Sequence, residues 1–382
     1  MIRVTIKSVR IIRDALQANQ ELWRGDGRRA LLVKWVLCVA LLCQFAFCPK
    51  LWFGERSFPT VPVFPGSPQL PIFYGNVWFV SLVIGLLWVA VAPRPRWAVI
   101  AAMLLALLLV CFDINRLQPW FYEYMVLLMT VVFADNEMAT AGFVLAALYV
   151  WSGLQKFNQG FATVVFPWLG DGYVRSAWFL APTIEVLIGV CLLIPRLRTV
   201  GLIGAFAMHG TLLGRLIGLN TNSVIWPWNF WMPILALAVF KGNPSVTFPA
   251  LVRSGYSKVL FALVGAMPAL NFAGWWDDYL SASLYSGRAK EGYIFLTPAG
   301  EKVVPASMQP YLIHRSDRNG FDIILWSTKE LNVPPYPEIR AYRGLAQKLV
   351  EQGIPEPEMS LVVSDRLSVG ETAPKYRLEP IR

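Results

Sequence analysis

The stretch 30-ALLVKWVLCVALLCQFAFC-48 decides the fold. One cation, Lys34, and one amide, Gln44, are its main interruptions in an otherwise apolar run. A helix needs about 20 predominantly apolar residues to cross a hydrocarbon core of about 30 Å. The stretch therefore predicts a transmembrane helix close to the N-terminus.

The rest of the chain repeats this signal. Of its 382 residues, 56% are hydrophobic and 15% charged, and the mean hydropathy is +0.49. Soluble domains carry about 25% charged residues. We predict an all-α polytopic membrane bundle of about nine transmembrane helices over residues 30–275, some of them short and tilted. The other eight spans are expected at 76–91, 97–112, 120–133, 138–153, 178–194, 199–216, 224–240 and 259–275.

Both ends of the chain differ from this bundle. Residues 1–29 are basic and mixed in polarity, and are interpreted as an interfacial amphipathic segment. Residues 276–382 have ordinary globular composition and predict a small soluble α+β domain, either a lid or a docking platform. Within it we expect strands at Phe321–Trp326 and Met359–Val363 and a helix at Tyr336–Gln352.

The distribution of cations predicts the orientation. Cytoplasmic loops carry an excess of Lys and Arg. If every span crosses, ten loop cations lie on the N-terminal side and six on the other. The N-terminus is therefore expected in the cytoplasm and, with nine crossings, the C-terminal domain outside it; eight crossings would place that domain in the cytoplasm. The net charge of +10 lies mostly at helix ends, which favours anionic membrane lipid over nucleic acid as the partner.

Three polar segments lie at the expected outer ends of spans: FDINRLQPWFYEYM (112–125), WSGLQKFNQGF (151–161) and GLNTNSVIWPWNFWM (218–232). They are expected to converge on one site. Lys156 is the candidate catalytic residue, although a lysine at a span end also snorkels to the headgroups, and Asp113 with Arg116 also fits a loop ion pair. The candidate substrate-binding residues are Asp113, Arg116, Gln118, Tyr122, Tyr124, Asn158, Asn220, Asn222 and Asn229.

Two ionisable residues lie deeper, in the middle of spans. Glu185 is in APTIEVLIGV and His209 is in AFAMHGTLL. Polar groups at this depth are costly and usually face the bundle interior or a partner. We expect both to face inward, and their similar depth makes them candidates for pairing. With two histidines in the whole chain, a histidine-rich metal site is excluded and no metal is predicted.

The segment YVWSGLQKFNQGF (149–161) resembles the corresponding stretch of vitamin K-dependent γ-carboxylases and of the horizontally transferred transmembrane (HTTM) domain, and it is similar to DoxX/MauE-type membrane proteins. Asp113, Tyr122 and Tyr124 fall at the matching upstream spacing. The resemblance implies that Lys156 is the base that deprotonates a reduced quinone. Gln118, Pro119 and Trp120 replace the family's Asn-Asn-His, so glutamate carboxylation is not expected.

Two functions follow from these residues and this resemblance, and the sequence does not decide whether the protein is an enzyme. The first is a quinone-linked, oxidoreductase-like membrane protein with Lys156 as acid or base and a quinone as its cofactor or substrate. The alternative is a non-catalytic assembly factor or scaffold whose C-terminal domain docks a partner protein. Transport of a small solute is weaker, because the sequence has no evident inverted repeat.

Overall fold

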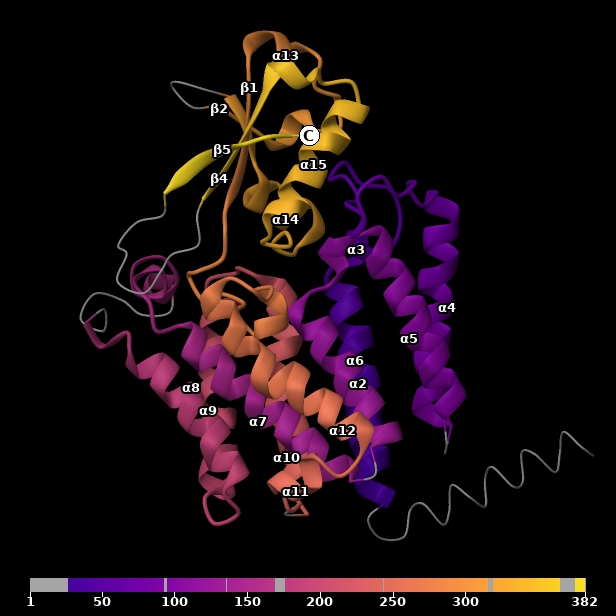
Figure 1. Ribbon diagram of the computed structural model, residues 1–382, viewed down its shortest axis with the longest axis vertical. Helices are drawn as coiled ribbons and strands as arrows, with labels where there is room; N and C mark the ends of the chain where they lie inside the picture. Colours follow the sequence, from indigo (N-terminus) through magenta and orange to yellow (C-terminus); the bar gives the residue numbers. More distant parts are fainter. Residues whose placement is uncertain are drawn as a thin grey trace, which may run out of the picture.

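A computed structural model describes residues 27–92, 95–134, 136–168, 176–242, 244–314, 319–364 and 375–381. The expected interfacial segment therefore lies almost wholly outside the described residues. The chain forms a helical bundle with a smaller domain seated on one end of it (Figure 1). We call this end of the bundle the domain end and the opposite one the far end.

Long apolar helices build the bundle. They are α2 (Gly27–Phe47), α4 (Ile72–Val91), α5 (Arg96–Phe112), α6 (Pro119–Phe133), α7 (Glu137–Gln155), α8 (Leu180–Leu193), α9 (Arg198–Gly218) and α10 (Trp226–Phe240). A last segment begins as α12 (Gly255–Leu260), continues as a π-helical turn (Phe261–Ala266) and ends as a 3-10 helix (Met267–Ala273). Short helices α3 (Pro49–Trp52) and α11 (Phe248–Leu251) lie in the connections.

Six helical stretches in the described residues are long and apolar enough to cross a membrane: 28–47, 72–91, 137–155, 198–218, 223–240 and 255–273. Three shorter apolar helices, α5, α6 and α8, account for the other predicted spans. Large apolar side chains such as Trp88 and Ile203 stay exposed on the bundle surface, as contact with lipid requires. The chain is therefore a multi-pass membrane protein, and the number nine stays a prediction.

Two glycines set the packing of α7 against α8. A Cβ on Gly153 would lie 2.6 Å from Cγ2 of Val186 and 2.7 Å from the carbonyl oxygen of Pro182. A Cβ on Gly189 would lie 2.7 Å from the carbonyl oxygen of Ala146. Small residues let transmembrane helices approach this closely, and van der Waals packing then holds them together. The close approach fixes which side chains face each other across α7 and α8.

The C-terminal domain is a five-stranded antiparallel sheet with helices packed on it. The strands run in the order β2-β3-β1-β4-β5. Their bounds are β1 Gly292–Leu296, β2 Leu312–His314, β3 Asn319–Asp322, β4 Met359–Ser364 and β5 Tyr376–Glu379, and the helices are α13 (Pro298–Lys302), α14 (Ile323–Leu331) and α15 (Ile339–Glu351). The predicted α+β class is therefore confirmed, as are the strand at Met359–Val363 and the helix within Tyr336–Gln352.

The predicted strand at Phe321–Trp326 is wrong from Ile323 onward. β3 ends at Asp322, whose side chain accepts a hydrogen bond from the backbone N–H of Leu325. This cap starts α14 at Ile323, because it satisfies one of the backbone donors that a helix N-terminus leaves free. A short apolar run does not by itself distinguish a strand from a buried helix.

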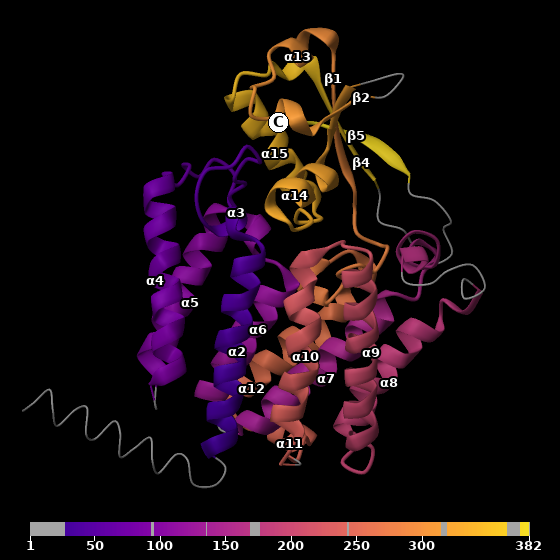
Figure 2. The ribbon, with the colours of Figure 1, turned by 180° about the vertical axis from the view of Figure 1, so that it is seen from behind.

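The start of α2 and the C-terminal domain lie at opposite ends of the bundle, as both views show (Figures 1 and 2). The connection between α8 and α9 lies at the far end, whereas the linker that enters the C-terminal domain lies at the domain end (Figure 2). This arrangement agrees with termini on opposite sides of a membrane. Which of the two sides is the cytoplasm stays a prediction.

Candidate functional site

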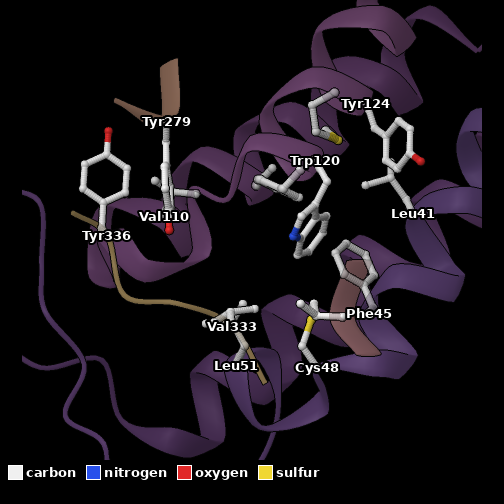
Figure 3. Close-up of a cluster of buried hydrophobic side chains, with 14 of the residues drawn as sticks. Leu41, Phe45, Cys48, Leu51, Val110, Trp120, Tyr124, Tyr279, Val333 and Tyr336 are labelled. Carbon is white, nitrogen blue, oxygen red and sulfur yellow. The ribbon is translucent and has the colours of Figure 1, made fainter. Parts of the chain in front are cut away.

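The C-terminal domain is attached to the bundle through residues 332–336 (NVPPY), which we call the plug. Val333 and Tyr336 of the plug are buried, and Val333 lies beside Leu51 while Tyr336 faces Tyr279 (Figure 3). The tyrosine ring centroids are 5.3 Å apart. Packing of this kind, with both rings out of water, stabilises the contact mainly through apolar burial. The C-terminal domain is therefore docked on the bundle, as a lid would be.

One of the predicted polar segments, 112–125, holds this plug in place. The Gln118 amide donates to the carbonyl oxygen of Pro334 at 3.0 Å. The neighbouring Asn115 accepts from the backbone N–H of Tyr336 at 3.0 Å. Buried polar groups that are paired with backbone atoms in this way hold the fold together. We therefore assign Gln118 an anchoring role in this conformation.

Asp113 and Arg116 form a buried cluster under the plug. Asp113 binds Arg56 across a 2.5 Å ion pair and caps the short 3-10 helix Ile114–Arg116 through the N–H of Asn115. Arg116 lies 4.0 Å from Asp113 and donates to the carbonyl oxygens of Leu51 and Leu109. These contacts tie the loop after α3 to the end of α5, which fits the loop-ion-pair interpretation.

Lys156 lies one residue beyond α7 and faces α8. Its Nζ is 2.7 Å from Oε2 of Glu185 and 2.6 Å from Oγ of Ser152, and it also reaches the Ser152 carbonyl oxygen at 3.2 Å. Both charged side chains keep 14% of their surface exposed. The pair exists because Gly153 brings α7 and α8 together one turn below. Ionisable groups in the membrane half usually have a partner or line a cavity, and here the two side chains are each other's partner.

His209 has its own partners, so the structure does not pair it with Glu185. Its Nδ1 is 2.9 Å from Oδ1 of Asn229 and its Nε2 is 2.9 Å from the hydroxyl of Tyr149. The Asn229 amide nitrogen donates to the carbonyl oxygen of Ile225, so its oxygen faces the ring as an acceptor. Nδ1 therefore carries the proton, and Nε2 accepts from Tyr149. His209 is 4% exposed, as expected for an inward-facing residue.

The remaining predicted residues have separate surroundings. Asn158 closes the turn after α7, donating to Gln155 and Ser286 and accepting from Phe161. Asn222 accepts from the hydroxyl of Tyr285 at 2.8 Å. Asn220 and Asn222 both have left-handed backbone (φ 48° and 51°), which asparagine tolerates, and they form the turn between α9 and α10.

These contacts place the predicted residues in three hydrogen-bonded groups, and the single shared cavity stays a prediction. Asp113 belongs to the plug anchor, Lys156 to the pair with Glu185, and Asn229 to the histidine network. Tyr122 lines a crevice on the opposite face of α7, together with Glu123, whereas Tyr124 is buried against the Trp228 ring. Among the described residues, no cluster of His, Cys, Asp or Glu could hold a metal ion.

No site role was predicted for Ser152, Tyr149 or Glu123. Ser152 and Lys156 are four residues apart, so they share a helix face, a signal that the sequence did contain. Tyr149 precedes Ser152 by three residues on that face, which orients it toward α9. Nothing in the sequence distinguishes Glu123 from a residue at a polar span end.

A family model described as "Methylamine utilisation protein MauE" matches residues 127–223. This match covers about a quarter of the chain and includes Tyr149, Lys156, Glu185 and His209. It leaves out Asp113, Gln118 and Asn229. The comparison supports the DoxX/MauE part of the resemblance, and the likeness to carboxylases and the HTTM domain stays a prediction. Searches of curated proteins and of solved structures find no match.

Proposed function

We propose that this MauE-like membrane protein binds a quinone, or another lipophilic molecule with oxygen acceptors, at the pair formed by Lys156 and Glu185. The observation that carries the proposal is the partial exposure of this ion pair in the membrane half of the chain. The Asp113 cluster and the histidine network, by contrast, are almost fully covered. A molecule dissolved in the membrane would reach the pair without unfolding the bundle.

The geometry suggests a division of roles between the two side chains. The Lys156 Nζ already donates to Glu185 and to Ser152, so it would donate to a ligand oxygen in the same way. Glu185, as the carboxylate, would accept the proton when a quinol O–H ionises. The products are then a neutral Glu185 carboxyl and a quinol oxyanion whose charge faces the Lys156 ammonium. In this proposal Lys156 stabilises the oxyanion and Glu185 is the base, which modifies the role that the resemblance implies for Lys156.

The test uses the full chain in lipid nanodiscs, with short-chain ubiquinone and menaquinone as probes and tryptophan fluorescence quenching as the readout. Lys156→Ala should weaken binding at least about tenfold, because a charge-assisted hydrogen bond is lost. Lys156→Arg should largely keep binding, since the positive charge stays. With the reduced quinols as probes, Glu185→Gln should keep binding but lose the absorbance of the quinol anion, because the amide cannot take the proton.

The matched control is Lys50→Ala, which removes an exposed cation in α3. It should bind the probes like wild type. If wild type binds neither quinone, or if Lys156→Ala binds as well as the control, the proposal is wrong.

A second function, docking of a partner protein, is favoured by one observation on the C-terminal domain. β5 is an edge strand of the sheet and carries Leu378, which is 72% exposed. An open strand edge pairs readily with another chain. A stoichiometric partner that is lost in Leu378→Ser but kept in Lys156→Ala would favour this scaffold function over quinone binding.

A further inference from the structure

A narrow crevice lies on the face of α7 turned away from Lys156. Its walls come from α6, α7, the segment 264–268 and the linker residues 279–282. The cavity volume is about 30 Å³, and the crevice is partly open to the outside. A cavity of this volume has space for a group of only a few heavy atoms.

Glu123 lines this crevice without a compensating partner. Its side chain belongs to α6 and is 5% exposed, and its Oε1 has no hydrogen-bond partner among the described residues. No described cation forms an ion pair with it within 4 Å, whereas Glu185 has Lys156 and Glu330 has backbone donors. An uncompensated buried carboxyl is costly, and such groups are usually explained by a ligand or a function.

The other walls are apolar and aromatic. Tyr122, Trp151 and Tyr279 contribute rings, and Val126, Val144 and Leu148 contribute aliphatic groups. The polar atoms of two of these rings already have hydrogen-bond partners outside the crevice. Trp151 Nε1 donates to the carbonyl oxygen of Gly265, and the Tyr279 hydroxyl donates to the carbonyl oxygen of Pro335. A ligand in the crevice would therefore contact the faces and edges of these rings and not their polar atoms.

We propose that this crevice binds a small organic ammonium ion, with Glu123 as its counter-ion. A carboxylate supplies the opposite charge, aromatic rings attract cations through their quadrupoles, and the volume limits the ligand to a compact head group. A neutral ligand would leave the carboxylate uncompensated. The proposal does not depend on quinone binding, because the two sites lie on opposite faces of α7 and share no residue.

The experiment titrates the full chain in nanodiscs with methylammonium, ethylammonium and tetramethylammonium chloride, each against equal sodium chloride, by calorimetry. Wild type should show saturable binding to at least one of these ions. Glu123→Gln should weaken that binding at least about tenfold, because it removes the charge while keeping the shape. Trp151→Leu should weaken it by a smaller factor, of about threefold, through loss of the cation–π contact.

Two controls keep the result interpretable. Glu55→Gln, which removes an exposed carboxylate, should bind like wild type. Labelling of Glu123 by a hydrophobic carbodiimide, read by mass spectrometry, should fall when the bound ammonium ion is present, and this requires no variant. Binding that is unchanged in Glu123→Gln, an absence of saturable binding in wild type, or equal competition by ethanol, the uncharged analogue of ethylammonium, would overturn the proposal. Lys156→Ala should leave ammonium binding intact, so the two proposals fail separately.

Discussion

Replacing Gly153 by alanine tests how the ion pair depends on helix packing. The added Cβ would lie 2.6 Å from Cγ2 of Val186, 2.7 Å from the Pro182 carbonyl oxygen and 2.9 Å from the Val186 nitrogen. Non-bonded carbon atoms are comfortable at about 3.5–4.0 Å. Two of the three contacts are to backbone, so a side-chain rotation does not relieve them. α8 must move away from α7 by about 1 Å to restore ordinary carbon contacts.

This displacement has two expected costs. Overpacking of this kind destabilises a folded protein by about 1–3 kcal/mol. The same movement would lengthen the 2.7 Å contact between Lys156 Nζ and Glu185 Oε2 beyond hydrogen-bond distance. Gly153→Ala should therefore lower both the midpoint of unfolding in detergent and the affinity for the quinone probe.

Gly210→Ala is the matched control, because a Cβ at that position on α9 meets nothing within 4 Å. It should be neutral or more stable by up to about 1 kcal/mol, since alanine has the higher helix propensity. Unfolding is followed by intrinsic fluorescence and by retention on size exclusion after heating. If Gly153→Ala unfolds at the same temperature as Gly210→Ala, the account of α7 and α8 packing is refuted.

Three further changes test other contacts. The Glu330 carboxylate accepts hydrogen bonds from the backbone N–H groups of Ser57 and Phe58, in the loop after α3. Glu330→Gln should weaken these bonds by about 2 kcal/mol and speed limited proteolysis of the loop, because the acceptor loses its charge. An unchanged cleavage rate would contradict this. Burial raises the pKa of Asp277, but hydrogen bonds from Arg340 and Tyr336 outweigh it and hold the value below the ordinary 3.8. The stability that this carboxylate contributes is therefore present above about pH 4 and is lost as the pH falls through the pKa of Asp277 in the folded protein. In Asp277→Asn, the free energy of unfolding should depend less on pH in this acid range than in wild type. Asn229→Ala should lower the free energy of unfolding by about 1–3 kcal/mol, because the buried His209 ring loses its hydrogen-bond acceptor. A variant as stable as wild type in thermal unfolding would show that water replaces the amide.

The apolar pattern of the sequence predicted the helical bundle well, because hydrophobicity and length decide membrane insertion before tertiary contacts form. It failed where local geometry decides. The last span departs from the regular α-helix through a π-helical turn and a 3-10 helix that contains Pro268. Proline supplies no backbone N–H, but the position of a helix irregularity also depends on neighbouring helices.

The candidate site was predicted in part. The sequence indicated Lys156, Glu185 and His209 as candidates, and their role in a site stays a prediction. Their hydrogen-bond partners did not follow from the sequence. Depth along a helix follows from residue number, whereas the direction in which a side chain points depends on how two helices are rotated against each other. Gly153 and Gly189 set that rotation, and it directs Glu185 to Lys156. The plug had no signal in the sequence, because NVPPY has neither helix nor strand periodicity.

The plug also has a consequence for the order in which this protein is made. Asn332 binds the carbonyl oxygen of Phe47 and the hydroxyl of Ser223, residues that the ribosome supplies long before it. The entropy cost of closing so large a loop falls once the bundle already holds Phe47 and Ser223 near each other. We therefore expect the plug to dock after the bundle has folded. We expect a chain that stops before Asn332 to leave Leu51 and Tyr279, which the plug covers, exposed, and exposed apolar surface of this kind attracts chaperones and proteases.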